Sequence, residues 1–240
     1  MALITCKDAA FAYEGRTVVD QLDFTVGTGD YLCIVGENGS GKSTLMKGIL
    51  GLMRPRHGEI VMGDGLKPTQ IGYLPQQGTG QKDFPASVYE VVISGRLSSR
   101  GIVPFYSKAD RQAALDNMER LGILPLRKKS FRELSGGQQQ RALLGRALCA
   151  TKKALLLDEP AAGLDPLVTE ELYATIKSLS KDIGITIIMI SHDIQAAVQY
   201  ASHILHLQNK QLFFGTTEDY VKAETGRMFL KGGTGNDSSD

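Results

Sequence analysis

The 240-residue chain is predicted to adopt an α/β fold, for two reasons. Short apolar runs at residues 31–35, 154–157 and 185–190 are typical of buried strands. Helical apolar patterns lie between these runs, and one of them opens at Pro166, a residue type favoured at the first position of a helix. Strands that alternate with amphipathic helices indicate one large α/β domain or two small ones.

Composition and charge narrow the class of protein. The chain is 42% hydrophobic and 22% charged, with a net charge of +1, which is typical of a globular protein and argues against nucleic-acid binding by bulk electrostatics. Cys6, Cys33 and Cys149 lack metal-ligand spacing, and the last two lie in apolar runs, as inert core residues of a cytoplasmic protein would. The first residues do not resemble a signal peptide, and no apolar run is long enough to span a bilayer. We therefore expect any work at a membrane to depend on a partner.

A glycine-rich segment follows the strand at 31–35 and opens a helix. It fits the pattern G-x-x-x-x-G-K-[ST], in which glycines let consecutive N–H groups face an anion and the helix N-terminus adds its positive end. Lys42 would reach the β- and γ-phosphates of a nucleotide, and the Ser43 hydroxyl would ligate Mg²⁺. A glycine-rich turn that only starts a helix is the plainer alternative, but the length of the match disfavours it. The predicted nucleotide-binding residues here are Gly36, Glu37, Asn38, Gly39, Ser40, Gly41, Lys42, Ser43 and Thr44.

Short strands flank this segment. Residues 3–26 are predicted to form two antiparallel strands, and Tyr13 at the end of the first is either a packing residue or a flat surface for a nucleotide base. Further strands are predicted at 58–62 and 71–74. Gln76, just after the second of these, is either an ordinary loop residue or a group that binds Mg²⁺ or positions water.

Residues 78–133 change character, because helical patterns replace strands. Residues 94–106 within this stretch look loop-like, with two glycines and Pro104. We predict a helical subdomain, at about residues 78–150, inserted in an α/β domain that spans residues 1–231. The small polar residues 232–240 are predicted to form a disordered tail.

Three polar groups mark the ends of later elements. Ser135 is a good N-cap for the helix that follows it, and the glycines after it leave N–H groups accessible. The strand at 154–157 ends in Asp158 and Glu159, where open α/β sheets bind ligands, although a solvated strand end has the same pattern. The strand at 185–190 leads to His192. A hairpin around residues 209–210 and a short helix are expected to complete the fold.

In this order, the motifs resemble those of the ATP-binding cassette (ABC) family of ATPases over nearly the whole chain. Residues 36–43 resemble the family's Walker A loop, and residues 155–159 resemble Walker B with the catalytic glutamate. Residues 134–138, LSGGQ, are identical to its signature sequence, which is a very specific match. The softer matches are Gln76 with the Q-loop, residues 162–165 with the D-loop and His192 with the switch histidine.

The resemblance implies a P-loop NTPase fold: a mixed sheet with an N-terminal antiparallel β-subdomain and the inserted helices. It implies ATP hydrolysis with Mg²⁺ by a homodimer, in which ATP lies between Walker A of one copy and the signature of the other. Asp165 would cross the dimer interface. The signature residues are Leu134, Ser135, Gly136, Gly137 and Gln138.

The resemblance also implies roles in catalysis. Glu159 would act as the base on the attacking water, and His192 would contact the γ-phosphate. Lys42 would supply charge, and Tyr13 would stack on adenine. The Mg²⁺ ligands would be Ser43, Gln76 and Asp158, and the catalytic set would be Glu159, His192, Gln76 and Lys42.

Softer similarities concern the kind of cassette. Residues 83–88, 91–96, 107–110 and 136–141 resemble the ATPases of zinc and manganese importers, while residues 127–133 lack the Glu-rich element of exporters. The regulatory β-domain of sugar-type importers is not expected either. The resemblance therefore implies a separate subunit at the cytoplasmic face of the cell membrane that energises uptake of zinc or manganese. Its partners would be an integral membrane permease and, indirectly, an extracytoplasmic metal-binding protein, with no nucleic acid.

Three alternatives stay open. Iron-chelate (siderophore) importers share many of the softer similarities. A soluble cassette ATPase of translation or DNA repair usually has two cassettes or long coiled-coil insertions, which are not seen here. A GTPase switch would need N-K-x-D, and residues 209–212 read NKQL.

A group of apolar residues before the signature is predicted to be exposed and to form one wall of a groove for a short helix of the permease. Packing inside the helical subdomain is the alternative for each residue alone. The group consists of Phe84, Val103, Phe105 and Tyr106.

Overall fold

The computed structural model describes residues 1–76, 85–99 and 105–232. These residues fall into two compact units: the first consists of Met1–Pro68 with the chain from Ile188 onward, and the second is Thr69–Ile187. Among the described residues, no helix combines the length and the apolar character needed to cross a bilayer. Each unit is an α/β assembly in its own right, which confirms the predicted class.

The N-terminal part of the first unit is an antiparallel sheet of strand order β2-β1-β4. The two antiparallel strands predicted over residues 3–26 are confirmed, and a two-residue turn joins them: Tyr13 pairs with Arg16, and Glu14 and Gly15 both have positive φ, at 47° and 80°. Two positive-φ residues match the right-handed twist of a tight hairpin. The strands are β1 (Ala2–Tyr13), β2 (Arg16–Gly27) and β4 (His57–Met62).

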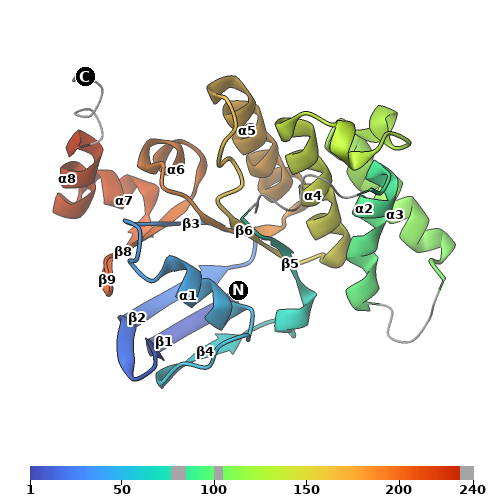
Figure 1. Ribbon diagram of the computed structural model, residues 1–240. Helices are drawn as coiled ribbons and strands as arrows, with labels where there is room; N and C mark the ends of the chain where they lie inside the picture. Colours follow the sequence, from blue (N-terminus) through green and yellow to red (C-terminus); the bar gives the residue numbers. More distant parts are fainter. Residues whose placement is uncertain (77–84, 100–104, 233–240) are drawn as a thin grey trace. The chain divides into compact units, whose positions relative to one another are not determined.

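The rest of the first unit is built on β3 (Tyr31–Val35), whose five residues are all buried, as the apolar run predicts. β8 (His203–Leu207) pairs with it in parallel, and β9 (Gln211–Thr216) pairs with β8 antiparallel, so this sheet is mixed. α7 lies against β8 and β9 (Figure 1). The helices of this unit are α1 (Lys42–Ile49), α6 (Ile194–Tyr200), α7 (Thr217–Lys222) and α8 (Glu224–Gly232).

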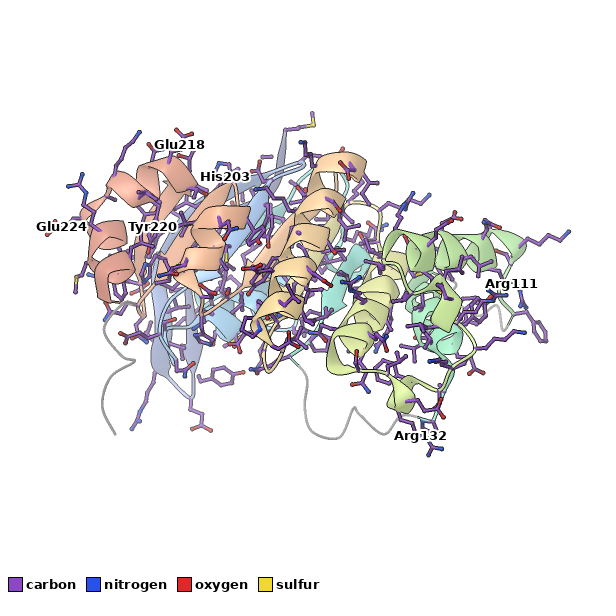
Figure 2. The ribbon with its side chains drawn as sticks, turned by 90° about the horizontal axis from the view of Figure 1, so that it is seen from above. Arg111, Arg132, His203, Glu218, Tyr220 and Glu224 are labelled. Atoms are coloured by element: carbon purple, nitrogen blue, oxygen red, sulfur yellow. The ribbon has the colours of Figure 1, made fainter. Side chains whose placement is uncertain are left out.

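The second unit joins a parallel strand pair to a group of helices. β5 (Ile71–Leu74) pairs with β6 (Ala154–Asp158), and β7 (Thr186–Ile190) begins in this unit and ends in the first. α2, α3 and α4 pack together as the predicted helical subdomain (Figure 1), and Arg111 and Arg132 lie at its surface (Figure 2). The helices are α2 (Val88–Ser94), α3 (Lys108–Arg120), α4 (Gly136–Ala150) and α5 (Pro166–Ile183). Short 3₁₀ helices occupy Pro68–Gln70, Gly95–Ser99, Leu124–Leu126 and Phe131–Glu133.

The prediction of a loop at residues 94–106 is wrong in its first part, because Gly95–Ser99 form a 3₁₀ helix. Tertiary contacts hold this helix: the Arg96 guanidinium donates to Asp110 Oδ1 (2.8 Å) and to the Cys149 carbonyl (3.0 Å). Gly95 lies so close to α4 that a Cβ would be 1.9 Å from the Arg146 carbonyl oxygen. Such long-range contacts leave no local periodicity in the sequence.

Several other predictions concern residues outside the described ranges. The start of the helical subdomain near residue 78, Phe84 and Val103 lie outside the described residues, as do residues 233–240 of the predicted tail. Gly232 is the last residue of α8 rather than part of a tail. All three cysteines, Cys6 included, are buried and free.

Candidate active site

The glycine-rich segment of the first unit forms the predicted loop between β3 and α1. Gly36, Gly39 and Gly41 have φ of 146°, 81° and 100°, where residues with side chains are strained. A Cβ on Gly36 would lie 2.2 Å from the Leu207 carbonyl oxygen, and one on Gly41 would lie 2.7 Å from Cβ of Val19. The loop therefore needs glycine at both ends for space as well as for conformation.

Lys42, the first residue of α1, is buried beside the loop. Its ammonium donates to the carbonyl oxygens of Gly36 and Glu37, each at 2.7 Å. Among the buried side-chain nitrogen and oxygen atoms of the described chain, Ser40 Oγ has no hydrogen-bond partner. Buried hydroxyls are normally hydrogen-bonded, so an unsatisfied one inside this loop fits a site that receives phosphate oxygens.

The outer side of the loop is held by Asn209, in the turn between β8 and β9. Its side-chain amide donates to the carbonyls of Val18 (3.0 Å) and Gly39 (3.2 Å), and its backbone N–H donates to the Ser40 carbonyl (3.1 Å). Asn209 has φ 56°, which asparagine tolerates better than most residues. Two of these three bonds occupy carbonyls of the loop, and the Ser40 N–H donates to a further loop carbonyl, that of Glu37 (3.2 Å), so main-chain hydrogen bonds hold the loop in shape.

Tyr13 and His192 also belong to the first unit. Tyr13 is 48% exposed, and Lys47 of α1 donates to its hydroxyl at 3.1 Å and lies 5.5 Å from the centre of its ring. His192 is exposed and follows Ser191, whose N–H donates to the Ile34 carbonyl of β3 (3.2 Å). Both residues therefore sit on elements that contact the strand or the helix of the loop.

A buried histidine, His206 of β8, pairs with Val35, the residue just before the glycine-rich loop. His206 of β8 bonds through Nδ1 to the Tyr220 hydroxyl (2.8 Å), and the ring of Phe229 lies 4.3 Å away. Burial, and then the charge of Lys42, lower the pKa of His206 to about 4; burial raises the pKa of Tyr220 to about 12. In Figure 2, Tyr220 lies inside this end of the unit, whereas Glu218 and Glu224 lie at its outer edge.

In the second unit, two predicted functional carboxylates, Asp158 and Glu159, lie at the end of β6. Glu159 has φ 48°, unusual for a residue with a side chain, and its Oε2 accepts a hydrogen bond of 2.8 Å from the amide nitrogen of Gln76. This contact uses the donor end of the Gln76 amide, and the acceptor end is the one that a metal ion would need. Asp158 is half-buried. The pKa of Tyr73 is raised by the burial of the Tyr73 hydroxyl and then by the negative charge of Asp158.

The signature sequence forms the N-terminus of α4 in the second unit. The predicted cap is confirmed: Ser135 Oγ accepts from the Gln138 N–H, and Gln138 Oε1 accepts from the Ser135 N–H (3.2 Å), a reciprocal capping box. A Cβ on Gly137 would lie 2.4 Å from Cγ1 of Val168, and one on Gly136 would lie 3.3 Å from Leu164. Gly137 is thus required for the close approach of α5, a reason beyond access to its N–H.

Asp165 caps α5 at its N-terminus. Its Oδ1 accepts from the Val168 N–H at 3.1 Å, and Val168 is the residue that packs on Gly137. The predicted D-loop and signature are therefore packed against each other within one chain. The role of Asp165 across a dimer interface stays a prediction.

Comparison with known proteins identifies the family. The sequence profile described as "ABC transporter" matches residues 19–162, a span from the first sheet to just past Glu159. The chain belongs to the ABC transporter family. It is accordingly an ATP-binding ATPase that works with membrane permease subunits.

Individual relatives are similar to this chain over most of its length. The manganese transport system ATP-binding protein MntB of Bacillus subtilis (strain 168) is 38% identical, covering 92% of this chain and 89% of its own length. The zinc transport system ATP-binding protein AdcC of Streptococcus pneumoniae (strain ATCC BAA-255 / R6) is 33% identical, covering 88% of this chain and 92% of its own. An inward-facing structure of a putative metal-chelate type ABC transporter matches with a TM-score of 0.84 at 29% identity, over 96% of this chain and 90% of that one.

Two residues that the sequence reasoning missed lie next to predicted ones: Asn209, described above, and Gln140. Gln140 lies one turn into the signature helix, is buried, and donates its side-chain N–H to the Pro160 carbonyl beside Glu159. The sequence did contain a signal for Gln140: the apolar pattern of α4 assigns its position to the buried face of the helix, where a polar side chain is unexpected.

The structure also bears on metal ligands. Within the described ranges, no three His, Cys, Asp or Glu side chains come together as a metal site. The predicted Mg²⁺ ligands are instead the Ser43 hydroxyl, the Gln76 amide oxygen and the Asp158 carboxylate. All three are oxygen ligands, which Mg²⁺ prefers, and proteins commonly bind Mg²⁺ through one or two carboxylates together with substrate phosphates.

Proposed function

We propose that this chain is the ATP-hydrolysing subunit of an importer that takes up a divalent metal ion, manganese or zinc. The supporting observation is the 38% identity, over 92% of the chain, to an ATP-binding protein named for manganese transport, together with a relative named for zinc transport. The subunit acts as a homodimer at the cytoplasmic face of the membrane, bound to an integral permease. An extracytoplasmic metal-binding protein delivers the ion to that permease.

The proposed chemistry divides between the two units. In the first, the N–H groups of residues 36–41, the Ser40 hydroxyl and Lys42 bind the phosphates, Tyr13 stacks on adenine and His192 contacts the γ-phosphate. In the second, the Glu159 carboxylate takes a proton from the attacking water, and Gln76 orients that carboxylate through the 2.8 Å bond. When bound, Mg²⁺ would be held by Ser43, Gln76 and Asp158 and would neutralise phosphate charge.

Glu159→Gln tests this division. The amide keeps the shape of the side chain but cannot take the proton, so ATP still binds and hydrolysis stops. Chromatography with ATP then resolves a trapped dimer. A variant that hydrolyses ATP at the wild-type rate would exclude Glu159 as the base.

The permease would dock on the second unit through exposed apolar side chains near α2 and α3. Phe105 is 79% exposed and Leu97 is 58% exposed, whereas Tyr106, which was predicted to be exposed, is half-buried and contributes less. Large apolar groups that stay exposed mark interaction surfaces. We expect Phe105→Asp to leave the ATPase activity of the isolated subunit unchanged and to abolish copurification with the permease. Met228→Asp, at a residue that is 69% exposed on α8 of the first unit, is the matched control and should copurify normally.

The transported ion is tested in cells. Deletion of the gene should lower cellular manganese or zinc and slow growth when that metal is scarce. The second candidate, uptake of an iron chelate, is favoured by the likeness to the metal-chelate type transporter. Unchanged manganese and zinc together with lost iron-chelate uptake would decide for that candidate.

A further inference from the structure

We propose that Gln140 is a positioning residue for ATP hydrolysis. It sets the orientation of the Glu159 carboxylate by holding the main-chain carbonyl of the next residue, Pro160. The inference rests on the proposed role of Glu159 as the base. Gln140 itself touches neither the nucleotide nor the water in this account, because its amide is directed to the protein main chain.

The contact that carries the inference joins the signature helix to the end of β6. Gln140, on α4, is 3% exposed, and its side-chain N–H donates to the carbonyl oxygen of Pro160. Pro160 is also buried and directly follows Glu159. A buried amide must make its hydrogen bonds inside the protein, so this bond holds the peptide between Pro160 and Ala161, one residue beyond Glu159.

Glu159 needs such support because of its backbone. Its φ of 48° lies in the left-handed region, which a residue with a side chain keeps only when surrounding contacts enforce it. The structure shows three contacts that do so: Gln76 bonds the carboxylate, the Ala162 N–H bonds the Glu159 carbonyl at 3.1 Å, and Gln140 bonds the next carbonyl. Loss of the Gln140 bond would let the backbone relax and would turn the carboxylate away from the position in which it meets water.

The bond also connects two functional parts of the second unit. Gln140 lies on the same helix as the signature residues, one turn after Gly136. The helix that begins with the signature therefore also holds the peptide beside the carboxylate.

The plainer explanation is that Gln140 only stabilises the fold, and the chain provides a control for it. Gln139 is the preceding residue of α4, is 5% exposed, and donates its side-chain N–H to a main-chain carbonyl, that of Phe131 (3.2 Å). The two glutamines match in type and in burial, and each donates its side-chain N–H to a main-chain carbonyl. They differ in destination, since Phe131 lies in the helical subdomain and Pro160 lies beside Glu159.

The experiment compares Gln140→Met with Gln139→Met in the full-length chain. Methionine keeps the length of the side chain and removes the amide, so each variant deprives a main-chain carbonyl of its glutamine donor and should lower the unfolding temperature. We expect Gln140→Met to lower kcat about ten- to a hundredfold, with the KM for ATP and the affinity for ATP unchanged. Gln139→Met should keep the wild-type kcat. Gln140→Leu, a second variant without the amide, should repeat the selective loss.

Glu159→Gln separates the possible outcomes. If Gln140 acts through Glu159, adding Gln140→Met to Glu159→Gln should lower the residual hydrolysis no further, because coupled residues are not additive. If either Gln140 variant folds and hydrolyses ATP at the rate of Gln139→Met, or if KM rises in place of the fall in kcat, the inference is overturned. Wild-type hydrolysis by Glu159→Gln would instead overturn the proposed base, which is a different result.

Discussion

The two units of the chain hold their functional groups by different means. In the first unit, the proposed phosphate-binding loop is shaped by two closely packed glycines, Gly36 against a main-chain carbonyl and Gly41 against the Val19 side chain, and by bonds to its own carbonyls from Lys42 and Asn209. In the second unit, the Gln76 amide bonds the Glu159 carboxylate directly, the Gln140 amide bonds the main-chain carbonyl of the next residue, Pro160, and the backbone at Glu159 is strained. A loop that offers N–H groups must be shaped by its backbone, whereas a general base must be aimed as a side chain.

Because of this difference, we expect the two units to respond differently to substitutions. Substitutions that add atoms to the first unit's loop should disturb the fold and ATP binding together. Substitutions that remove an amide near Glu159 should spare binding and lower turnover.

Gly36→Ala should have the largest effect on stability. The added methyl group would meet the Leu207 carbonyl oxygen at 2.2 Å in a backbone with φ 146°, so crowding and strain together should cost at least about 3 kcal/mol. Gly39→Ala is the matched control, because it has φ 81° but no atom within 4 Å; conformational strain alone should cost about 1–2 kcal/mol. Denaturant unfolding and ATP titration measure both variants. Equal costs would mean that the loop's packing is softer than the contacts indicate.

Mild acid should weaken the first unit through His206. Burial, then the charge of Lys42, lower its pKa to about 4, while its hydroxyl partner Tyr220 is itself kept neutral by a pKa raised to about 12. Below its ordinary pKa of 6.5, the unfolded chain binds a proton that the folded chain does not. Stability should therefore fall as the pH drops from about 6.5 to about 4, by on the order of 2 kcal/mol.

Thermal unfolding of wild type and His206→Gln across that range isolates the histidine. The second unit's Asp110 responds in a lower window: the hydrogen bonds from Arg96 and Ser107 lower its pKa to about 2, so its contribution is lost only as the pH falls below 3.8. Parallel pH profiles for wild type and His206→Gln would remove His206 from the acid response.

Asp165→Ala should have the smallest effect. The variant loses the bond to the Val168 N–H that starts α5, and loss of such a cap costs about 1 kcal/mol. Asp165→Asn keeps an acceptor and should unfold like the wild type. Urea titrations of the three proteins at a concentration where they are monomeric provide the comparison. If Asp165→Ala is as stable as the wild type, the residue serves only contacts outside its own chain.

Local patterns account for most of what could be predicted. The glycine loop, the Ser135 cap, the Pro166 helix start and the strand ending in Asp158 are each specified by neighbouring residues, because turns, caps and short buried strands depend on nearby chemistry. Contacts across long sequence distances could not be predicted this way. Asn209 bonds a carbonyl 170 residues earlier, and Gln140 bonds one 20 residues later.

The same limit explains why the reason for Gly137 was incomplete. Sequence alone suggested that it exposes an N–H group, and the structure adds that a side chain there would collide with Val168. It also explains the 3₁₀ helix at Gly95–Ser99, which depends on Asp110 and Cys149 rather than on its own pattern. Helix–helix approach and buried ion pairs are properties of the folded unit.

In the proposed division of labour, the first unit binds ATP and the second unit supplies hydrolysis. ATP affinity and single-turnover hydrolysis, measured side by side for Lys42→Met and Glu159→Gln, test this division. Lys42→Met removes a charge-assisted phosphate contact and should weaken ATP binding by about 1.5–3 kcal/mol. Glu159→Gln should bind ATP as the wild type does and hydrolyse it about 10²–10⁴-fold more slowly. Normal ATP affinity in Lys42→Met, or lost ATP affinity in Glu159→Gln, would contradict the division of labour between the two units.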